Sequence, residues 1–297
     1  QGMAGYQTGQ AWLVEAWVGW AWDAASKKAY WIGGGHRNGA DSSVYSVDFN
    51  ATDVADFFGR ETQPTAGPSI DGSSDPIDSG EPWSGNSSPS IHSYDALTWM
   101  PTVGKMIVNG GAESTGSVKG FGDWYFVWTP GSKGVGDQGF EAYRDNIDIL
   151  RNEFAGSAWV PGLDVVLYKN KKIATYDPAT NRWARAQQAP GSVGQTLACA
   201  PASAFPTSDQ PLCISIAATP VSQGGRGLSV YSFDRSSPPR PSHNYCIEAM
   251  PVDPEIDWNQ TGIAWDGDRR EFVFWNGESK MASLPARAID GCHNTGR

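Results

Sequence analysis

Short apolar stretches alternate with turn residues along this chain, and they recur in a fixed order. Most copies start with an aromatic residue and an aspartate, and each passes through a turn, continues as an apolar run and often ends at paired glycines. Apolar runs of this length, bounded by Gly, Pro, Asp and Asn, are typical of β-strands. The pattern therefore predicts β-hairpins at residues 22–34, 94–111, 159–183 and 265–277.

A second motif follows several of these hairpins. It is an apolar strand that ends in aspartate and turns back, as in "YDPATNRW" at 176–183. Asp177 and the proline after it initiate such a turn, and Asn181 tolerates the left-handed conformation that closes it. The same strand and turn occur at 43–57 and 228–239.

Together the two motifs predict a four-stranded antiparallel unit that is repeated along the chain. The units begin near residues 18, 92, 156, 194 and 260. Repeated sheets of this kind bury their faces against one another when they are arranged radially. We therefore expect an all-β fold, a β-propeller of five or six four-stranded antiparallel blades.

The spacing of the units predicts a single propeller domain over 1–297, with long loop insertions near 60–90 and 131–154. Apolar residues at helical spacing occur at 139–154, where they indicate the one plausible amphipathic helix. The apolar segment 11–17 is expected to complete the last blade and close the ring. The alternative is an incomplete ring that lacks a further blade.

Specific residues of these repeats resemble those of a known family. The strand-ending pairs Gly33-Gly34 and Gly110-Gly111, and the turn from Tyr176 to Trp183, are similar to those of kelch-type β-propellers, including the propeller of the galactose-oxidase family. The third unit lacks the glycine pair and the fourth is barely recognisable, which leaves the blade number open. The resemblance implies a fold found in secreted bacterial proteins and in phage structural proteins.

The resemblance to the galactose-oxidase family does not extend to its copper site. That chemistry needs two histidines, two tyrosines and a cysteine bonded to one tyrosine, together with an extra domain. This chain has four histidines, at positions 36, 92, 243 and 293, and the extra domain is not expected in it. We therefore predict no copper cofactor.

Charge narrows the range of partners. The net charge is −10, and the lysines and arginines are scattered along the chain. A nucleic-acid-binding surface needs clustered cations, so nucleic acid is not an expected partner. No apolar run approaches the length of a membrane span, so membrane insertion is not expected either.

Four cysteines are candidates for disulfide bonds. Cys199 and Cys213 flank a loop rich in proline and serine, so they could staple a hairpin, and Cys246 and Cys292 would then pair. The sequence leaves all three connectivities open, as well as buried thiols. Disulfides would place the protein in an extracellular environment or on a virion surface.

Candidate binding residues lie where strands meet loops. His36, Arg37 and Asn38 follow the first glycine run, and His92 precedes the equivalent strand of the second unit. Each histidine either bonds to a neighbouring blade or contacts a ligand. Trp83 and Trp124 could stack on a sugar ring or anchor a protein interface.

Two further features bear on the loops and on the tryptophans. The acidic residues of the 62–90 insertion could bind Ca²⁺, although a solvated loop is the favoured interpretation. Most of the tryptophans at 12, 17, 20, 22 and 31 are expected in the blade core or between blades.

These observations predict a non-enzymatic binding or structural protein. Its propeller loops would contact a protein or a glycan, as a virion or cell-surface component within a larger assembly. No catalytic residue is assigned. The alternative is a glycan-active enzyme of the sialidase or glycosidase type, with acidic residues at the propeller axis. That alternative rests on a partial Asp-box at 78–83.

Overall fold

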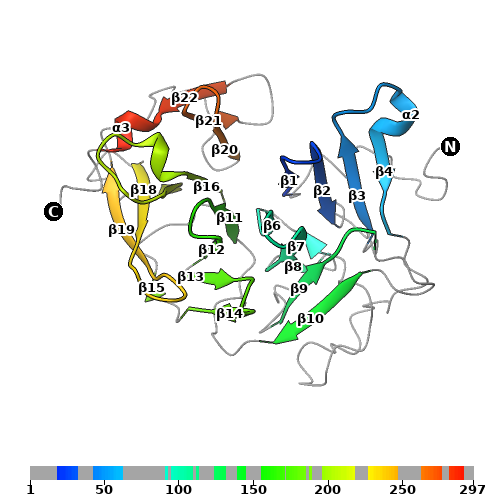
Figure 1. Ribbon diagram of the computed structural model, residues 1–297, viewed down its shortest axis with the longest axis horizontal. Helices are drawn as coiled ribbons and strands as arrows, with labels where there is room; N and C mark the ends of the chain where they lie inside the picture. Colours follow the sequence, from blue (N-terminus) through cyan, green and yellow to red (C-terminus); the bar gives the residue numbers. More distant parts are fainter. Residues whose placement is uncertain are drawn as a thin grey trace. The chain divides into compact units, whose positions relative to one another are not determined.

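The computed structural model shows an all-β protein of the β-propeller class (Figure 1). Its blades are five antiparallel sheets, which confirms the predicted fold class. The structure describes residues 19–32, 43–62, 91–92, 95–109, 112–113, 124–131, 139–144, 155–170, 172–184, 187–188, 196–217, 227–246, 262–275 and 281–290. Within these ranges, no helix is long and apolar enough to cross a membrane.

The chain divides into two compact units, residues 1–153 and 154–297. In the first unit, each blade is a four-stranded sheet, with strand orders β1-β2-β3-β4 and β10-β9-β7-β6. A short helix, α2, precedes β4, and β5 pairs with β8. The bounds are β1 (Ala21–Asp23), β2 (Lys28–Ile32), β3 (Val44–Asp48), α2 (Val54–Phe57), β4 (Phe58–Arg60), β5 (Ile91–His92), β6 (Leu97–Met100), β7 (Lys105–Val108), β8 (Ala112–Glu113), β9 (Trp124–Trp128) and β10 (Phe140–Arg144).

The second unit contains three sheets. Their strand orders are β11-β12-β13-β14 with β15 beside β13, β16-β17-β18-β19, and β20-β21-β22. The bounds are β11 (Gly156–Val160), β12 (Val165–Lys169), β13 (Lys172–Asp177), β14 (Arg182–Trp183), β15 (Gln187–Gln188), β16 (Leu197–Ala200), η1 (Ala202–Ala204), β17 (Leu212–Ala217), β18 (Gly227–Phe233), β19 (Pro241–Cys246), β20 (Gly262–Asp266), β21 (Glu271–Trp275), β22 (Met281–Pro285) and α3 (Ala286–Asp290).

The first hairpin of four blades closes through the same backbone conformation. The residue before the second strand has a positive φ in each case: Lys27, Gly104, Asp164 and Arg270. A left-handed residue at this position reverses the chain within a four-residue turn. The sequence repeat is therefore a repeat of turn geometry.

Aromatic and aliphatic side chains hold neighbouring blades together within each unit. In the first unit, the ring of Tyr30 lies 5.4 Å from that of Trp99 and 5.2 Å from that of Trp128, which joins the two four-stranded sheets. In the second unit, one buried cluster joins the β16–β19 sheet to the β20–β22 sheet, and another joins the β11–β14 sheet to the β16–β19 sheet.

The helix predicted over 139–154 is wrong for its first residues. Residues Phe140–Arg144 form β10, which pairs with β9 and lies within the expected 131–154 insertion. Phe140 and Ala142 pack on the core of the first unit, whereas Tyr143 stacks on Tyr125 at 5.3 Å. This alternation has a period of two, and pairing with β9 outweighs the helical spacing of the same residues.

The disulfide between Cys199 and Cys213 is confirmed. The two residues lie directly opposite each other on β16 and β17, so the bond staples the hairpin that the sequence predicted. Cys246 lies at the end of β19, and Cys292 lies outside the described residues. The second pairing therefore stays a prediction.

Candidate binding surface

Most of the predicted binding residues lie outside the described part of the chain: His36, Arg37, Asn38 and Trp83. The backbone of His92 belongs to β5, where it pairs with Ala112, and Trp124 starts β9 opposite Arg144. The pairing of β5 with β8 places His92 beside the chain that follows the second glycine pair. The acidic residues of the 62–90 insertion also lie outside the described ranges, so the Ca²⁺ hypothesis stays a prediction.

A different group of side chains forms an exposed apolar surface on the first blade. We define the aromatic surface as Trp22, Phe49, Val54, Phe57 and Phe58. The rings are in continuous contact, at 5.4 Å from Trp22 to Phe49, 5.8 Å from Phe49 to Phe57 and 4.9 Å from Phe57 to Phe58. Trp22 is 48% exposed, Phe49 54%, Phe58 57% and Val54 86%.

Of the tryptophans expected mostly in the core, Trp12 and Trp17 lie outside the described residues, Trp31 is buried as expected, and Trp22 is about half exposed. Trp20 is 41% exposed and stacks on Trp31 at 5.2 Å. Sequence reasoning missed the phenylalanines at 49, 57 and 58. The signal was the run "DFNATDVADFFGR" (48–60), where aromatic residues adjoin polar turn residues that cannot bury them.

A capped helical turn positions Val54, Phe57 and Phe58 of the aromatic surface. The Oδ1 of Asp53 accepts a hydrogen bond from the backbone N–H of Ala55 at 2.9 Å, which caps the first turn of α2. This single helical turn ends at Phe57, and the chain continues directly into β4 at Phe58. Figure 1 shows α2 beside β3 and β4, in blue and cyan.

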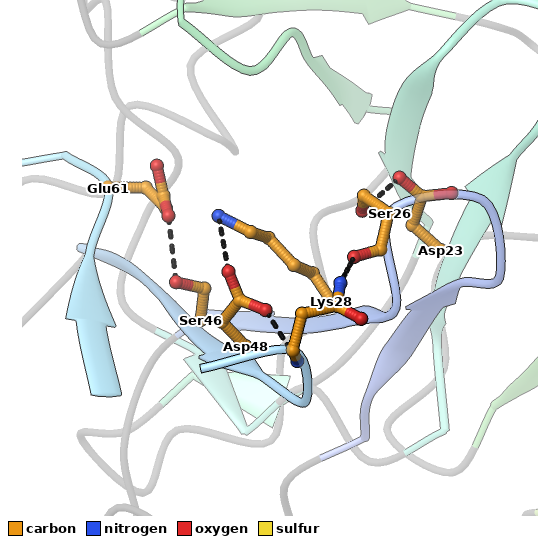
Figure 2. A network of polar contacts seen from close by, with 7 residues as sticks. Asp23, Ser26, Lys28, Ser46, Asp48 and Glu61 are labelled. Atoms are coloured by element: carbon orange, nitrogen blue, oxygen red, sulfur yellow. Dashed lines mark hydrogen bonds and ion pairs between the residues drawn. The ribbon is translucent and has the colours of Figure 1, made fainter. Parts of the chain in front are cut away.

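A polar network on the same sheet holds the turn that carries Phe49 (Figure 2). The Nζ of Lys28 lies 3.3 Å from the Oδ2 of Asp48, whose Oδ1 accepts the backbone N–H of Asn50 at 2.8 Å. The side-chain amide of Asn50 in turn donates to the carbonyl of Ser26 at 2.7 Å. The hydrogen bond from Asn50 and the contact with Lys28 lower the pKa of Asp48 below its usual value. Asp48 therefore stays ionised, and the turn before Phe49 is fixed at neutral pH.

Elsewhere on the sheet, the Oγ of Ser46 donates to Glu61 at 2.7 Å, and the guanidinium of Arg60 donates to Ser43 at 2.7 Å. These bonds link β3, and Ser43 immediately before it, to the segment that starts at β4. The exposed rings of the aromatic surface therefore lie on a sheet whose strands are linked by side-chain hydrogen bonds, and not on an isolated loop.

A buried polar cluster in the second unit has the residue types of a nucleophilic site. The Nζ of Lys169, on β12, donates to the Oγ of Ser215, on β17, at 2.7 Å. That Oγ lies 3.0 Å from the hydroxyl of Tyr231, and the Nζ lies 5.9 Å from the centre of the same ring. Burial lowers the pKa of Lys169 to about 7, which is the range of a general base.

The burial of this cluster argues against a catalytic role for its three side chains. Lys169 is 1% exposed, and Ser215 and Tyr231 are completely buried. A substrate must approach a nucleophile to within bonding distance. In this structure the three side chains instead join two neighbouring blades through polar contacts.

No group of three or more His, Cys, Asp and Glu side chains suited to a metal ion occurs among the described residues.

Known proteins resemble this chain only distantly. No protein family matches the sequence, and no curated protein matches it. The structure titled "Structure of YjhT" is similar over 90% of this chain and 78% of its own, with 11% identity and a TM-score of 0.48. A chain of the "Crystal Structure of Mitotic Checkpoint Complex" is similar over 90% of this chain and 62% of its own, with 11% identity and a TM-score of 0.45. No functional argument rests on similarities this distant.

Proposed function

We propose that this chain is a non-enzymatic binding or structural protein that contacts a protein partner through the aromatic surface of its first blade. The observation that carries the proposal is the continuous contact of Trp22, Phe49, Phe57 and Phe58 with about half of three of these rings exposed. Exposed apolar side chains gathered on a rigid sheet are typical of interaction sites. Aromatic anchors also dominate the binding energy of protein interfaces.

Charge around the aromatic surface indicates the chemistry of the partner. Asp53 and Asp56 are exposed on α2, beside Val54 and Phe57. A complementary surface would combine apolar side chains with lysine or arginine at its edge. The rings meet edge to face, at 77° to 90°, so they offer a ridged apolar surface rather than one flat platform for a sugar ring.

The wider setting of the proposal is an exported protein, on a cell or virion surface. The Cys199–Cys213 disulfide supports it, because disulfides persist in oxidising compartments. The kelch-type assignment is part of the same proposal. It is supported by five antiparallel sheets, four of which repeat one turn conformation in their first hairpin.

The glycan-active enzyme is the second candidate, and the described carboxyls do not favour it. A glycosidase acid needs a raised pKa. Glu141 shows the opposite, because hydrogen bonds from Tyr143 and Lys105 lower its pKa. The partial Asp-box at 78–83 lies outside the described residues, so the alternative stays a prediction.

The test compares the wild-type chain with a triple variant, Trp22→Ser, Phe49→Ser and Phe58→Ser. A partner is captured from an extract of the source cells, identified, purified and titrated calorimetrically against both proteins. We expect the triple variant to bind at least ~10-fold more weakly, since aromatic anchors carry most of the energy. Val103→Ser, which removes an exposed apolar side chain from the turn before β7, is the matched control.

Three results would overturn the proposal. The first is reconstituted binding that the triple variant retains in full. The second is binding to a glycan array that is lost in the same variant, which would make the partner a glycan. The third is hydrolysis of 4-nitrophenyl glycosides by the wild-type chain, which would establish the enzyme.

A further inference from the structure

The turn that carries Phe49 also contains an acceptor sequence for N-linked glycosylation. Asn-x-Ser/Thr triplets in which x is not proline begin at Asn50, Asn86 and Asn259. The triplet 50–52 lies within the described residues, whereas the other two lie outside them. A glycan is bulky and hydrated, so an occupied acceptor must lie at the surface of the folded protein.

The folded chain meets this requirement at Asn50. The side chains of Asn50 and Thr52 are exposed, and Ala51 between them is half-buried. The triplet occupies the connection from β3 to α2 (Figure 1), where the backbone N–H of Ala51 donates to the carbonyl of Asp48 at 3.2 Å. A substituent on such a surface turn extends into solvent and displaces no core side chain.

The hydrogen bonds of Asn50 are compatible with a glycan. Its backbone N–H donates to the Oδ1 of Asp48 at 2.8 Å, and its Nδ2 donates to the carbonyl of Ser26 at 2.7 Å. A side-chain amide has two N–H groups, and the bond to Ser26 uses one of them. Glycosylation replaces one hydrogen, so the substituted nitrogen keeps one N–H with which it can donate to Ser26.

The residues beside Asn50 are apolar and exposed. Phe49, the preceding residue, contacts Trp22 through rings 5.4 Å apart, and both side chains are about half exposed. Aromatic rings offer an apolar face on which a sugar ring can stack. A glycan is also solubilising, so at this position it would help to keep the neighbouring apolar rings in water.

We propose that Asn50 is the site of an N-linked glycan, which lies at the edge of the aromatic surface. The donor is an oligosaccharide joined to a lipid through a diphosphate, and an oligosaccharyltransferase makes the transfer. The Nδ2 of Asn50 forms a bond to the anomeric carbon of the first sugar, the bond from that carbon to the diphosphate oxygen breaks, Nδ2 loses one proton and the lipid diphosphate leaves. Nothing is oxidised or reduced.

The setting for this modification is the exported location proposed above. The Cys199–Cys213 disulfide supports that location, because disulfides persist in the compartments through which exported proteins pass. The glycan site rests on that part of the proposed function and is independent of the partner protein.

A glycan at Asn50 should limit how a partner approaches the aromatic surface. Phe49 adjoins Asn50 in the chain, whereas Val54 belongs to α2 and Phe58 to β4. The glycan therefore competes with the partner mainly for Phe49 and the ring of Trp22 beside it. Partial burial of one such ring contributes roughly 3- to 10-fold to affinity, so glycosylation should weaken partner binding by about that factor.

The experiment isolates the full chain from its source cells through an affinity tag and measures the occupancy of Asn50 by mass spectrometry. Trypsin cleaves after lysine and arginine, so residues 38–60 form one peptide, which contains no other acceptor triplet. In the wild type this peptide should carry the mass of an oligosaccharide. Peptide-N-glycosidase should remove that mass and convert the asparagine to aspartate.

Two substitutions at Thr52 separate loss of the glycan from damage to the turn. Thr52→Ala removes the triplet but leaves Asn50 and its hydrogen bonds, so the peptide 38–60 should lose the modification completely. Thr52→Ser preserves the triplet and should retain the modification, which makes it the matched control. Because Thr52 is exposed, both variants should fold like the wild type, and circular dichroism with thermal unfolding checks this.

An unmodified peptide 38–60 in the wild-type chain would overturn the proposal. A modification that persists in Thr52→Ala would also overturn it, because the sugar would then be attached elsewhere. Calorimetric titration of the partner should give about 3- to 10-fold tighter binding to Thr52→Ala than to Thr52→Ser, and equal affinities would refute the effect on the partner. Occupancy is read from mass and partner binding from the aromatic triple variant, so either proposal can fail without the other.

Discussion

Lys169 illustrates how one buried side chain can set the pH dependence of stability. Its ammonium group is removed from water at the contact between β12 and β17, and it donates to Ser215. Burial lowers its pKa from 10.5 to about 7. A charged lysine at this position costs free energy in the folded state that the unfolded chain does not incur.

The sign of the effect follows from proton binding. Between about pH 7 and pH 10.5 the unfolded chain binds more protons at this site than the folded chain does, so stability increases as the pH rises through that range. Below about pH 7 both states are protonated and the cost is constant. Lys169 therefore lowers the free energy of unfolding most at and below neutral pH.

We predict that Lys169→Met raises the free energy of unfolding at pH 6 by about 1–4 kcal/mol, the range found when a buried charge is replaced by an apolar residue. The gain should decrease toward pH 9, where the wild-type lysine is mostly neutral when folded. Urea unfolding at several pH values measures both quantities. Lys27→Met, at an exposed turn position, serves as the control, and equal pH profiles for the wild type and Lys169→Met would contradict the prediction.

The roles of single residues could be predicted from the sequence where they depend on neighbours in the chain. Asp177 was predicted to initiate a turn, and its Oδ1 accepts the backbone N–H of Ala179 at 2.9 Å. Asn181 was predicted to be left-handed, and its φ is 54°. The role of Lys169 was not predicted, because its burial depends on Ser215 and Tyr231, which lie 46 and 62 positions further along the chain. Nothing near it in the sequence indicates that contact.

At the scale of elements, the repeated hairpin turn gives a matched pair of substitutions. Gly104 and Lys27 occupy the same place before the second strand of their blades, with φ values of 62° and 52°. Glycine adopts this conformation without steric cost, whereas a residue with a Cβ pays about 1 kcal/mol or more.

We predict that Gly104→Ala destabilises the protein by about 1 kcal/mol and that Lys27→Gly stabilises it by a similar or smaller amount. A Cβ on Gly104 would meet no atom within 4 Å, so the cost comes from the backbone alone. Thermal unfolding of both variants tests the pair. Shifts of the same sign in the two variants would show that the repeated turn does not control their stability.

Strands could be predicted from the sequence where the spacing of apolar residues fits a strand and does not also fit a helix. Hairpins with a short turn and an apolar second strand were recognised, and they correspond to β1–β2, β6–β7, β11–β12 and β20–β21. The segment 140–144 was misread because its aromatic residues fit both a helix and a strand. Pairing with β9, which no local pattern reveals, decides between the two.

At the scale of the whole molecule, the number of blades followed from the repeat, whereas the exposed surfaces did not. The five units expected near 18, 92, 156, 194 and 260 each contain one blade sheet, and the second also contains the two-stranded sheet of β5 and β8. The aromatic surface was missed because the sequence does not show whether another blade covers a given tryptophan. Only the burial of Trp31 and the exposure of Trp22 and Trp275 separate these cases.

The charge of the whole molecule predicts that polyanions do not bind it. The net charge is −10, and several described cations are held by acids: Lys28 by Asp48 at 3.3 Å and Lys105 by Glu141 at 2.9 Å. Binding to a polyanion gains free energy when protein cations replace counterions along the phosphates. Cations that are scattered and paired with carboxylates offer little of that gain.

We therefore predict that a fluorescent DNA duplex and immobilised heparin both fail to bind the chain at about 0.15 M salt. Lowering the salt concentration should not restore binding, because repulsion by the net negative charge then extends further. Fluorescence anisotropy and heparin chromatography measure this directly. Retention that weakens as salt is added would contradict it, because that dependence would reveal a cationic surface that the net charge conceals.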